Sequence, residues 1–129
     1  RLERLGWGVR EAWDVSSTAE RYRAYIQQSR GEFACVKPYC PQFVNGWTSN
    51  RTICYLATGK PAVVQYTGPS RFLPEAEGIF RFRSMDDAVR AFAALEADYD
   101  RHSRAARGLA AEYFDGSKVV RRILERALA

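Results

Sequence analysis

The chain has 129 residues, of which 47% are hydrophobic and 27% charged, a composition ordinary for a globular protein. This length fits a single domain over residues 1–129 with a core of its own. No apolar run is long enough to span a bilayer, and the N-terminus lacks a signal-peptide pattern. We therefore expect a cytoplasmic protein without a membrane span.

The net charge of +5 arises from 20 basic and 15 acidic residues. The arginines are scattered along the chain, and several fall on predicted exposed helix faces: Arg90, Arg101, Arg104 and Arg121. No basic run interleaves with aromatic residues, and no nucleic-acid motif occurs. We therefore expect no nucleic-acid partner, and nucleic-acid binding stays a third hypothesis that rests on charge alone.

The three cysteines are Cys35, Cys40 and Cys54, and none belongs to a CxxC pair. An odd number without this spacing argues against a disulfide framework and a four-ligand zinc site. His102 is the only histidine and cannot complete a metal site alone. We expect buried free thiols, an exposed histidine and no metal.

The first predicted elements are a short strand over residues 7–10 and a helix behind it. Ser17 and Glu20 have the spacing of a capping box, which marks a helix N-terminus. An apolar stripe with helical spacing follows: Tyr22, Tyr25 and Ile26. A buried strand is predicted over residues 33–37, and a loop rich in proline and aromatic residues over 38–48.

The segment SNRTICYLATGKPAVVQY begins at Ser49, and Ser49 or Asn50 caps a helix that runs to about Thr58. Gly59 has the position after a helix that tolerates a left-handed backbone, and Pro61 prevents continuation. The apolar-rich run AVVQY then predicts a strand covered on both faces.

The second half begins with a loop over residues 67–77 and a short strand over 79–82. Ser84 and Asp87 form a second capping box. The helix behind it has its apolar residues at helical spacing: Met85, Ala88, Val89, Phe92, Leu95 and Tyr99. A further helix is predicted over 105–114. A last helix is expected to turn these residues inward: Val120, Ile123, Leu124 and Leu128.

Alternating strands and helices predict the α/β class, as a Rossmann-like open parallel sheet with helices on both faces and additional C-terminal helices. Right-handed crossovers bring the strand-to-helix loops to one edge of such a sheet, where ligands bind. We expect the loops over 38–48 and 67–77 at this edge.

The start of the helix at Ser49 has the components of an anion site. A helix N-terminus has unpaired N–H groups and a partial positive charge. Ser49 and Thr52 add two hydroxyls, and Arg51 adds a cation, which together favour a phosphate or diphosphate. The alternative is an ordinary serine cap with a solvated arginine. Glu75 and Glu77 resemble an acid–base pair, but we expect solvated loop charges there.

The segment ICYLATGKPAVVQYTG resembles a stretch of retaining GT-B glycosyltransferases with the pattern E-A-M-A-x-G-K-P-V-V-A-T-x-x-G. More closely, GWTSNRTICYLATGKPAVVQYTG is similar to the pattern G-W-F-S-D-R-S-x-x-Y-L-A-x-G-R-P-V-x-x-Q-x-T-G of a bacterial group of predicted glycosyltransferases, group 1-like. The flanks LGWGVREAWDVSSTAERYRAYIQQSRGEFACVK, LPEAEGIFRFRSMDDA and AARGLAAEYFDGSKVVRRIL resemble what surrounds this motif, so the resemblance covers most of the chain.

The resemblance implies the later part of the C-terminal, donor-binding domain of a two-domain GT-B enzyme. Such an enzyme transfers a sugar from a nucleotide-diphosphate donor, and an N-terminal domain binds the acceptor. The chain begins at Arg1 without an initiator methionine, and this part alone is expected to lack turnover. No metal and no cofactor are implied, and no catalytic residue is assigned. The implied donor-binding residues are Lys37, Trp47, Ser49, Asn50, Arg51, Thr52, Thr67 and Gly68.

The chain departs from the family pattern at two acidic positions. Cys54 stands where a glutamate typically binds the donor ribose, and Gly46 stands where another glutamate is often found. Relative to the closer group, Thr48 replaces a phenylalanine and Asn50 an aspartate, while Arg51 is kept. We expect Cys54 to be a packed side chain. The alternative hypothesis is a degenerate, non-catalytic domain that binds a phosphorylated ligand or a protein partner.

Overall fold

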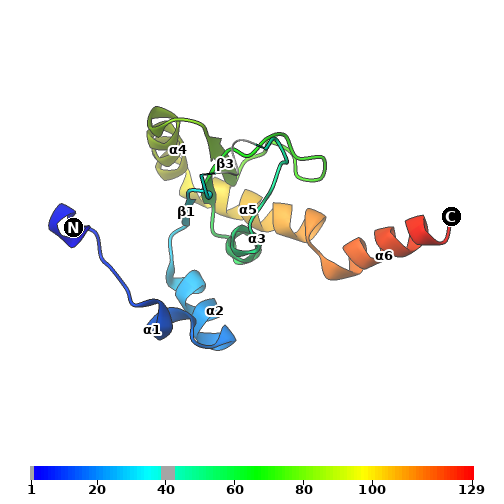
Figure 1. Cartoon of the computed structure of the whole chain (residues 1–129), viewed down its shortest axis with the longest axis horizontal. Helices are drawn as coiled ribbons and strands as arrows, with labels where there is room; N and C mark the ends of the chain where they lie inside the picture. Colours follow the sequence, from blue (N-terminus) through cyan, green and yellow to red (C-terminus); the bar gives the residue numbers. More distant parts are fainter. Residues whose placement is uncertain (1, 39–42) are drawn as a thin grey trace.

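The computed structural model describes residues 2–38 and 43–129, and its central feature is a three-stranded parallel sheet (Figure 1). The strands have the order β1-β2-β3. In chain order the elements are η1 (Glu3–Leu5), α1 (Ala12–Ser16), α2 (Ala19–Gln28), β1 (Glu32–Ala34), α3 (Asn50–Ala57), β2 (Ala62–Gln65), β3 (Ile79–Phe82), α4 (Met85–Ala97), α5 (Tyr99–Tyr113) and α6 (Gly116–Ala127).

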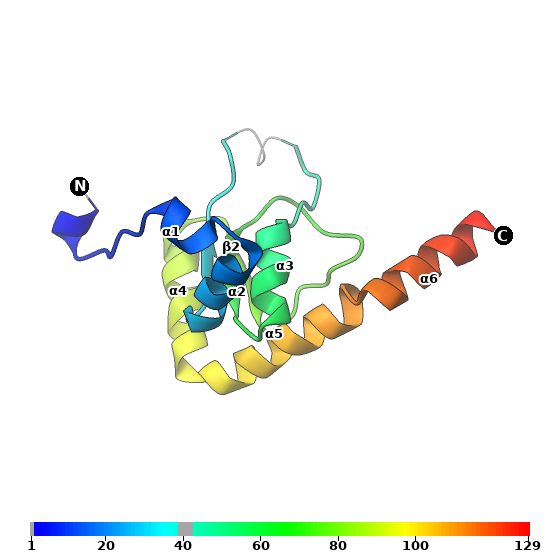
Figure 2. The ribbon, with the colours of Figure 1, turned by 90° about the horizontal axis from the view of Figure 1, so that it is seen from below.

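Helices cover both faces of this sheet, which confirms the predicted Rossmann-like α/β architecture (Figure 2). On one face, α3 and α5 enclose an apolar cluster: Leu56, Ala62, Leu73, Ile79, Ala106, Leu109 and Ala110. On the other face, α4 encloses a second cluster: Val63, Phe82, Ala88, Ala91 and Leu95. Phe33 extends the second cluster by stacking on Phe82, with 5.5 Å between ring centroids.

Local signals in the sequence set several boundaries as expected. Ser49 is the N-cap of α3, and its side chain accepts a hydrogen bond from the N–H of Arg51. Gly59, which follows α3, has a φ of 70°, a conformation that favours glycine. At α4, Ser84 and Asp87 form the predicted capping box. Each of these signals acts within a few residues and needs no distant partner.

The N-terminal region differs from the prediction. Residues 7–10 form no strand; η1 precedes them, and α1 starts at Ala12. The cap of α2 is Thr18, whose hydroxyl accepts from the N–H of Arg21 at 3.2 Å, so the capping box predicted at Ser17 is wrong and the N-cap lies one residue later. The strand predicted over 33–37 is β1, and it already ends at Ala34. A strand requires a neighbouring strand with which to form hydrogen bonds, and the local pattern at 7–10 does not show whether one is present.

The C-terminal helix α6 is the largest departure in packing. It buries no residue, and the side chains expected to point inward are exposed: Val120, Ile123, Leu124 and Leu128. Figures 1 and 2 show α6 projecting away from the sheet beyond the end of α5. The amphipathic pattern predicted the helix correctly, but it did not predict that the sheet provides no surface for it.

Candidate functional site

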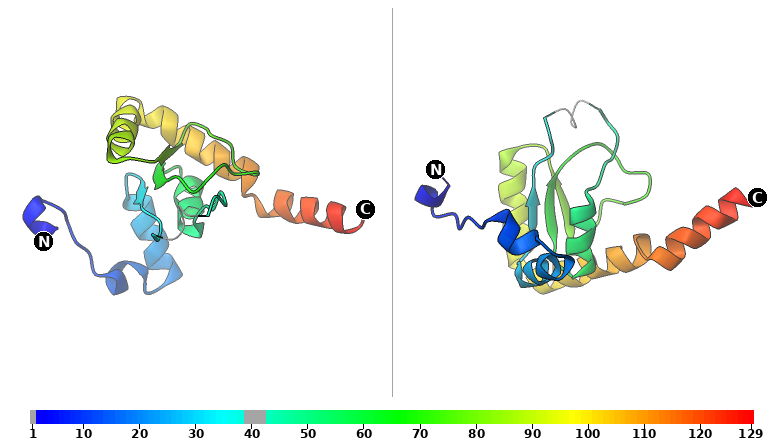
Figure 3. Two further views of the ribbon diagram at one scale, coloured as in Figure 1. Left: turned by 45° about the horizontal axis from the view of Figure 1, so that its top comes forward. Right: turned by 60° about the horizontal axis from the view of Figure 1, so that its bottom comes forward.

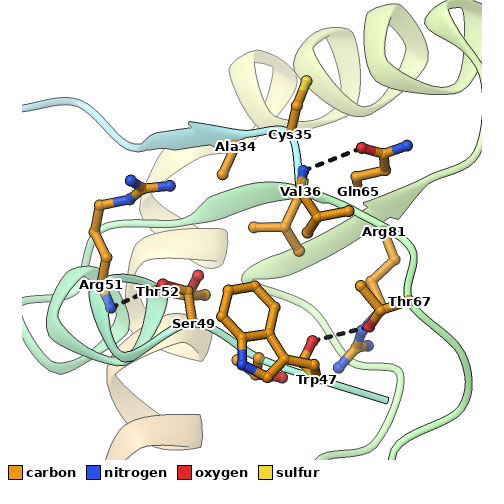
Figure 4. A pocket seen from close by; sticks show the side chains of 12 residues that line it. Ala34, Cys35, Val36, Trp47, Ser49, Arg51, Thr52, Gln65, Thr67 and Arg81 are labelled. Atoms are coloured by element: carbon orange, nitrogen blue, oxygen red, sulfur yellow. Dashed lines mark hydrogen bonds between the residues drawn. The ribbon is translucent and has the colours of Figure 1, made fainter. Parts of the chain in front are cut away.

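A pocket lies at the carboxyl ends of the strands (Figure 4). It is on the face of the sheet that α3 covers, and Figure 3 shows α3 lying beside the strands. Its floor is a row of residues paired across the sheet: Ala34 of β1 is level with Val64 of β2, which is level with Arg81 of β3. The remaining lining residues come from the last residue of β2, from the segments after β1 and β2 and from the start of α3: Cys35, Val36, Trp47, Thr48, Ser49, Arg51, Thr52, Gln65 and Thr67. The pocket thus has the position that ligands take in open parallel sheets.

The first turn of α3 forms one side of this pocket. Ser49 caps the helix by accepting from the N–H of Arg51 at 3.2 Å, and Thr52 is almost fully buried. The helix itself offers no acceptor to the N–H groups of Asn50 and Thr52, because the carbonyls four residues before them precede α3. The partial positive charge of this helix end is therefore directed at the pocket.

Arg51, in the first turn of α3, forms an ion pair with Glu32 of β1. Its Nε donates to Oε1 of Glu32 at 2.6 Å, and this hydrogen bond raises the pKa of Arg51. The Glu32 side chain is only 3% exposed, whereas that of Arg51 is 49% exposed. The second carboxylate oxygen of Glu32 is buried without a hydrogen-bond partner among the described residues. The positive charge of Arg51 is therefore largely balanced by a carboxylate that is fixed in the interior.

Arg81 lies on the opposite side of the pocket from Arg51 (Figure 4). Its side chain is 7% exposed, and its Nη1 contacts Oε2 of Glu75 at 3.0 Å. Nη1 also donates to the carbonyl of Pro74 at 3.3 Å, while Nη2 is buried without a partner in the described part of the chain. The Glu75 side chain is 68% exposed, so this pair has a buried cation and a solvated anion.

Two loop segments meet over the pocket. The N–H groups of Asn45 and Gly46 donate to the carbonyl of Thr67 at 3.0 and 3.1 Å, and the Thr67 hydroxyl donates to the carbonyl of Trp47 at 2.8 Å. Gly46 has a φ of 63°, and a Cβ at this position would lie 2.5 Å from the carbonyl oxygen of Pro69. A larger residue at Gly46 would therefore force the two segments apart.

The structure brings together most of the predicted site residues, but not all of them. Five line the pocket: Trp47, Ser49, Arg51, Thr52 and Thr67. Lys37 and Asn50 are exposed and lie outside the lining. Gly68 is buried with a φ of 116°, and a Cβ there would lie 2.7 Å from Cγ1 of Val44, so it shapes the neighbouring turn. Arg81 and Glu32 were missed by sequence reasoning.

Predictions about the cysteines and the histidine were partly wrong. Cys35 and Cys54 are free but exposed, and Cys54 is neither packed nor part of the pocket lining; Cys40 lies outside the described residues. His102 is half-buried, with its ring edge against Phe80 at 4.9 Å between centroids. Within residues 2–38 and 43–129, no cluster of side chains fits a metal ion, and no helix is long and apolar enough to cross a membrane.

Comparisons with protein-family models, with curated proteins and with solved structures gave no significant match. The function must therefore be argued from the pocket and from the residues that build it.

Proposed function

We propose that this chain is the donor-binding part of a cytoplasmic GT-B-type glycosyltransferase, in which the pocket binds the phosphates of a nucleotide-diphosphate sugar. An N-terminal domain would bind the acceptor, and turnover would require both domains. The observation that carries this proposal is the position of the first turn of α3, which faces a pocket at the carboxyl edge of a parallel sheet with an arginine on either side. Helix ends and guanidinium groups are both favourable partners for phosphate.

In such an enzyme, the contribution of these residues would be electrostatic. A sugar leaves its donor as negative charge builds up on the nucleotide diphosphate, and fixed N–H donors stabilise that charge at little reorganisation cost. The amide groups at the start of α3 are fixed by the Ser49 cap, and Thr67 holds the Trp47 backbone in place above the pocket. A fixed set of donors of this kind suits binding of a leaving diphosphate.

The proposal predicts that UDP, GDP, ADP or dTDP raises the thermal unfolding midpoint of the chain, because ligands that bind only the folded state stabilise it. Ala34 lies in the pocket floor, so Ala34→Leu should fill the pocket and abolish the rise. The matched control is Ala94→Leu on the exposed side of α4. The proposal is wrong if none of the four nucleotides shifts the midpoint, or if Ala34→Leu binds as well as the unmodified chain.

A second candidate is a degenerate domain that binds a phosphorylated ligand or a protein partner without catalysis. Cys54 favours it, because a thiol cannot replace a carboxylate as a hydrogen-bond acceptor for ribose, and the exposed Cys54 lies outside the pocket lining. Cys54→Glu distinguishes the two candidates. A tenfold or larger gain in nucleotide affinity would indicate a lost ribose contact, whereas an unchanged affinity would mean that the ribose is held by other residues.

A further inference from the structure

The guanidinium of Arg81 has a hydrogen-bonding group that the described residues leave unused. Its Nη1 contacts Glu75 and the carbonyl of Pro74, but Nη2 is buried and has no partner there. An unpaired buried donor is destabilising, and buried polar groups in folded proteins are nearly always paired. Arg81 therefore calls for a functional explanation, and the pocket that it lines provides one.

The two arginines of the pocket differ in how readily they can receive a ligand anion. Arg51 is paired with Glu32, which is 3% exposed and would have to leave the interior to release it. Arg81 is paired with Glu75, which is 68% exposed and can move into water at little cost. A phosphate oxygen can therefore displace the carboxylate partner of Arg81 much more easily than that of Arg51, whose bond to Glu32 uses only Nε.

We propose that Arg81 is the side chain that binds the ligand's phosphoryl group in this pocket, and that Glu75 is the carboxylate with which this group competes. The inference rests on the proposed function, because it names the residue that holds the diphosphate. The first turn of α3 and the guanidinium of Arg81 approach the same pocket from different elements (Figure 4). A planar guanidinium can give two parallel hydrogen bonds to phosphate.

The size of the pocket limits what the Arg81 site takes. Its volume is about 40 Å³, roughly three times the least space that holds one water molecule, about 10–15 Å³. That space fits the oxygens of one phosphoryl group but not a nucleoside, which would lie outside it. The chemical class is therefore a diphosphate or another phosphate group with more than one negative charge, since a second negative charge favours it over the Glu75 carboxylate.

The experiment measures binding of inorganic pyrophosphate and of UDP to the 129-residue chain by titration calorimetry at low and physiological salt. Arg81→Met removes the cation but keeps the length of the side chain, and Glu75→Gln removes its competitor. Arg83→Met is the matched control, because Arg83 is exposed, carries the same charge and packs over the Tyr66 ring outside the pocket lining. Circular dichroism checks that each variant is folded.

We expect Arg81→Met to weaken pyrophosphate binding at least tenfold, Glu75→Gln to strengthen it about threefold to tenfold, and Arg83→Met to leave it within twofold. In the double variant, Glu75→Gln should no longer strengthen binding, because its effect acts through Arg81. The inference is overturned if Arg81→Met binds as well as the control, or if Glu75→Gln weakens binding. If Arg81→Met does not fold, Glu75→Gln alone decides.

Binding of UDP and pyrophosphate by the variants distinguishes a wrong role for Arg81 from a wrong proposed function. A chain that binds neither UDP nor pyrophosphate contradicts both. A chain whose UDP binding is lost in Ala34→Leu but kept in Arg81→Met retains the donor pocket, and then only the role of Arg81 is wrong.

Discussion

The two sides of the pocket use the same pair of residue types in opposite arrangements. On the α3 side the carboxylate of Glu32 is buried and its arginine is half-exposed. On the β3 side the arginine, Arg81, is buried and the carboxylate of Glu75 is exposed. The difference suggests a division of roles, because a buried carboxylate fixes its cation in place, whereas an exposed carboxylate leaves its cation available to another anion.

The largest stability effect is expected when the exposed partner of the buried carboxylate is removed. Arg51→Met leaves Glu32 buried and unpaired, and we expect a loss of about 2–4 kcal/mol in the free energy of unfolding. Urea unfolding measures it, with Arg104→Met on the exposed face of α5 as the neutral control. Adding Glu32→Gln should recover most of the loss. A loss no larger than that of the control would mean that Glu32 does not need its partner.

An intermediate effect is expected when the exposed partner of the buried cation is removed. Glu75→Gln leaves Arg81 without a carboxylate but with the carbonyl of Pro74. A guanidinium is more weakly hydrated than most ions and tolerates burial better, so we expect a loss of about 1 kcal/mol, or roughly 3–5 °C in the unfolding midpoint. A loss as large as that of Arg51→Met would remove the distinction between the two sides.

A small effect on stability is expected when the buried cation itself is replaced. Arg81→Met returns Glu75 to water and removes the unpaired Nη2. Replacing a buried ionic group with an apolar side chain of similar size is often neutral or stabilising, so we expect a change within about 1 kcal/mol in either direction. Differential scanning calorimetry would reveal a larger loss, which would indicate that Arg81 has a structural role instead of a ligand-binding one.

The smallest effect is expected at an ion pair with both partners in water. Arg30 donates from Nε and Nη2 to the Glu96 carboxylate at 2.7 Å, and these hydrogen bonds lower the pKa of Glu96 below its ordinary value of 4.5. Because the pKa is lower in the folded state, this pair stabilises the fold above pH 4.5 and ceases to do so as the pH falls through the lowered pKa. Glu96→Gln should lower the unfolding midpoint slightly at pH 7. It should not lower the midpoint once the pH is far enough below 4.5 for Glu96 to be protonated in the folded chain, and a difference that persists there would contradict this assignment.

The parts of the fold that the sequence predicted are those with local causes. Ser49 and Gly59 delimit α3, and the Ser84–Asp87 box starts α4, because each signal acts within its own helix end. The strand expected over residues 7–10 was wrong because a strand depends on a distant partner. The exposed face of α6 was unpredictable for a similar reason, since periodicity indicates an apolar face but not what covers it.

The residues of the candidate site were likewise predicted only where a local sequence pattern marks them. The residues at the start of α3 were found because helix ends have a sequence signature. Glu32 was missed because it lies 19 residues before its partner Arg51, and no local pattern links the two. Arg81 could have been found, since in IFRF it alternates with two phenylalanines and so occupies a position that faces the interior beside Ile79.

The pairing of β3 with β2 constrains how this site can change. Side chains alternate along a strand, so Arg81 shares its face with Ile79, while Phe80 and Phe82 pack on the α4 side. A shift of β3 by one residue in register would place a phenylalanine at the pocket floor in place of the guanidinium. The guanidinium would then lie on the α4 side, among aromatic rings. Insertions or deletions between β2 and β3 are therefore tolerated only in the loop that joins the two strands. The packing of the two phenylalanines fixes the register of β3 against β2, and with it the position of the Arg81 guanidinium.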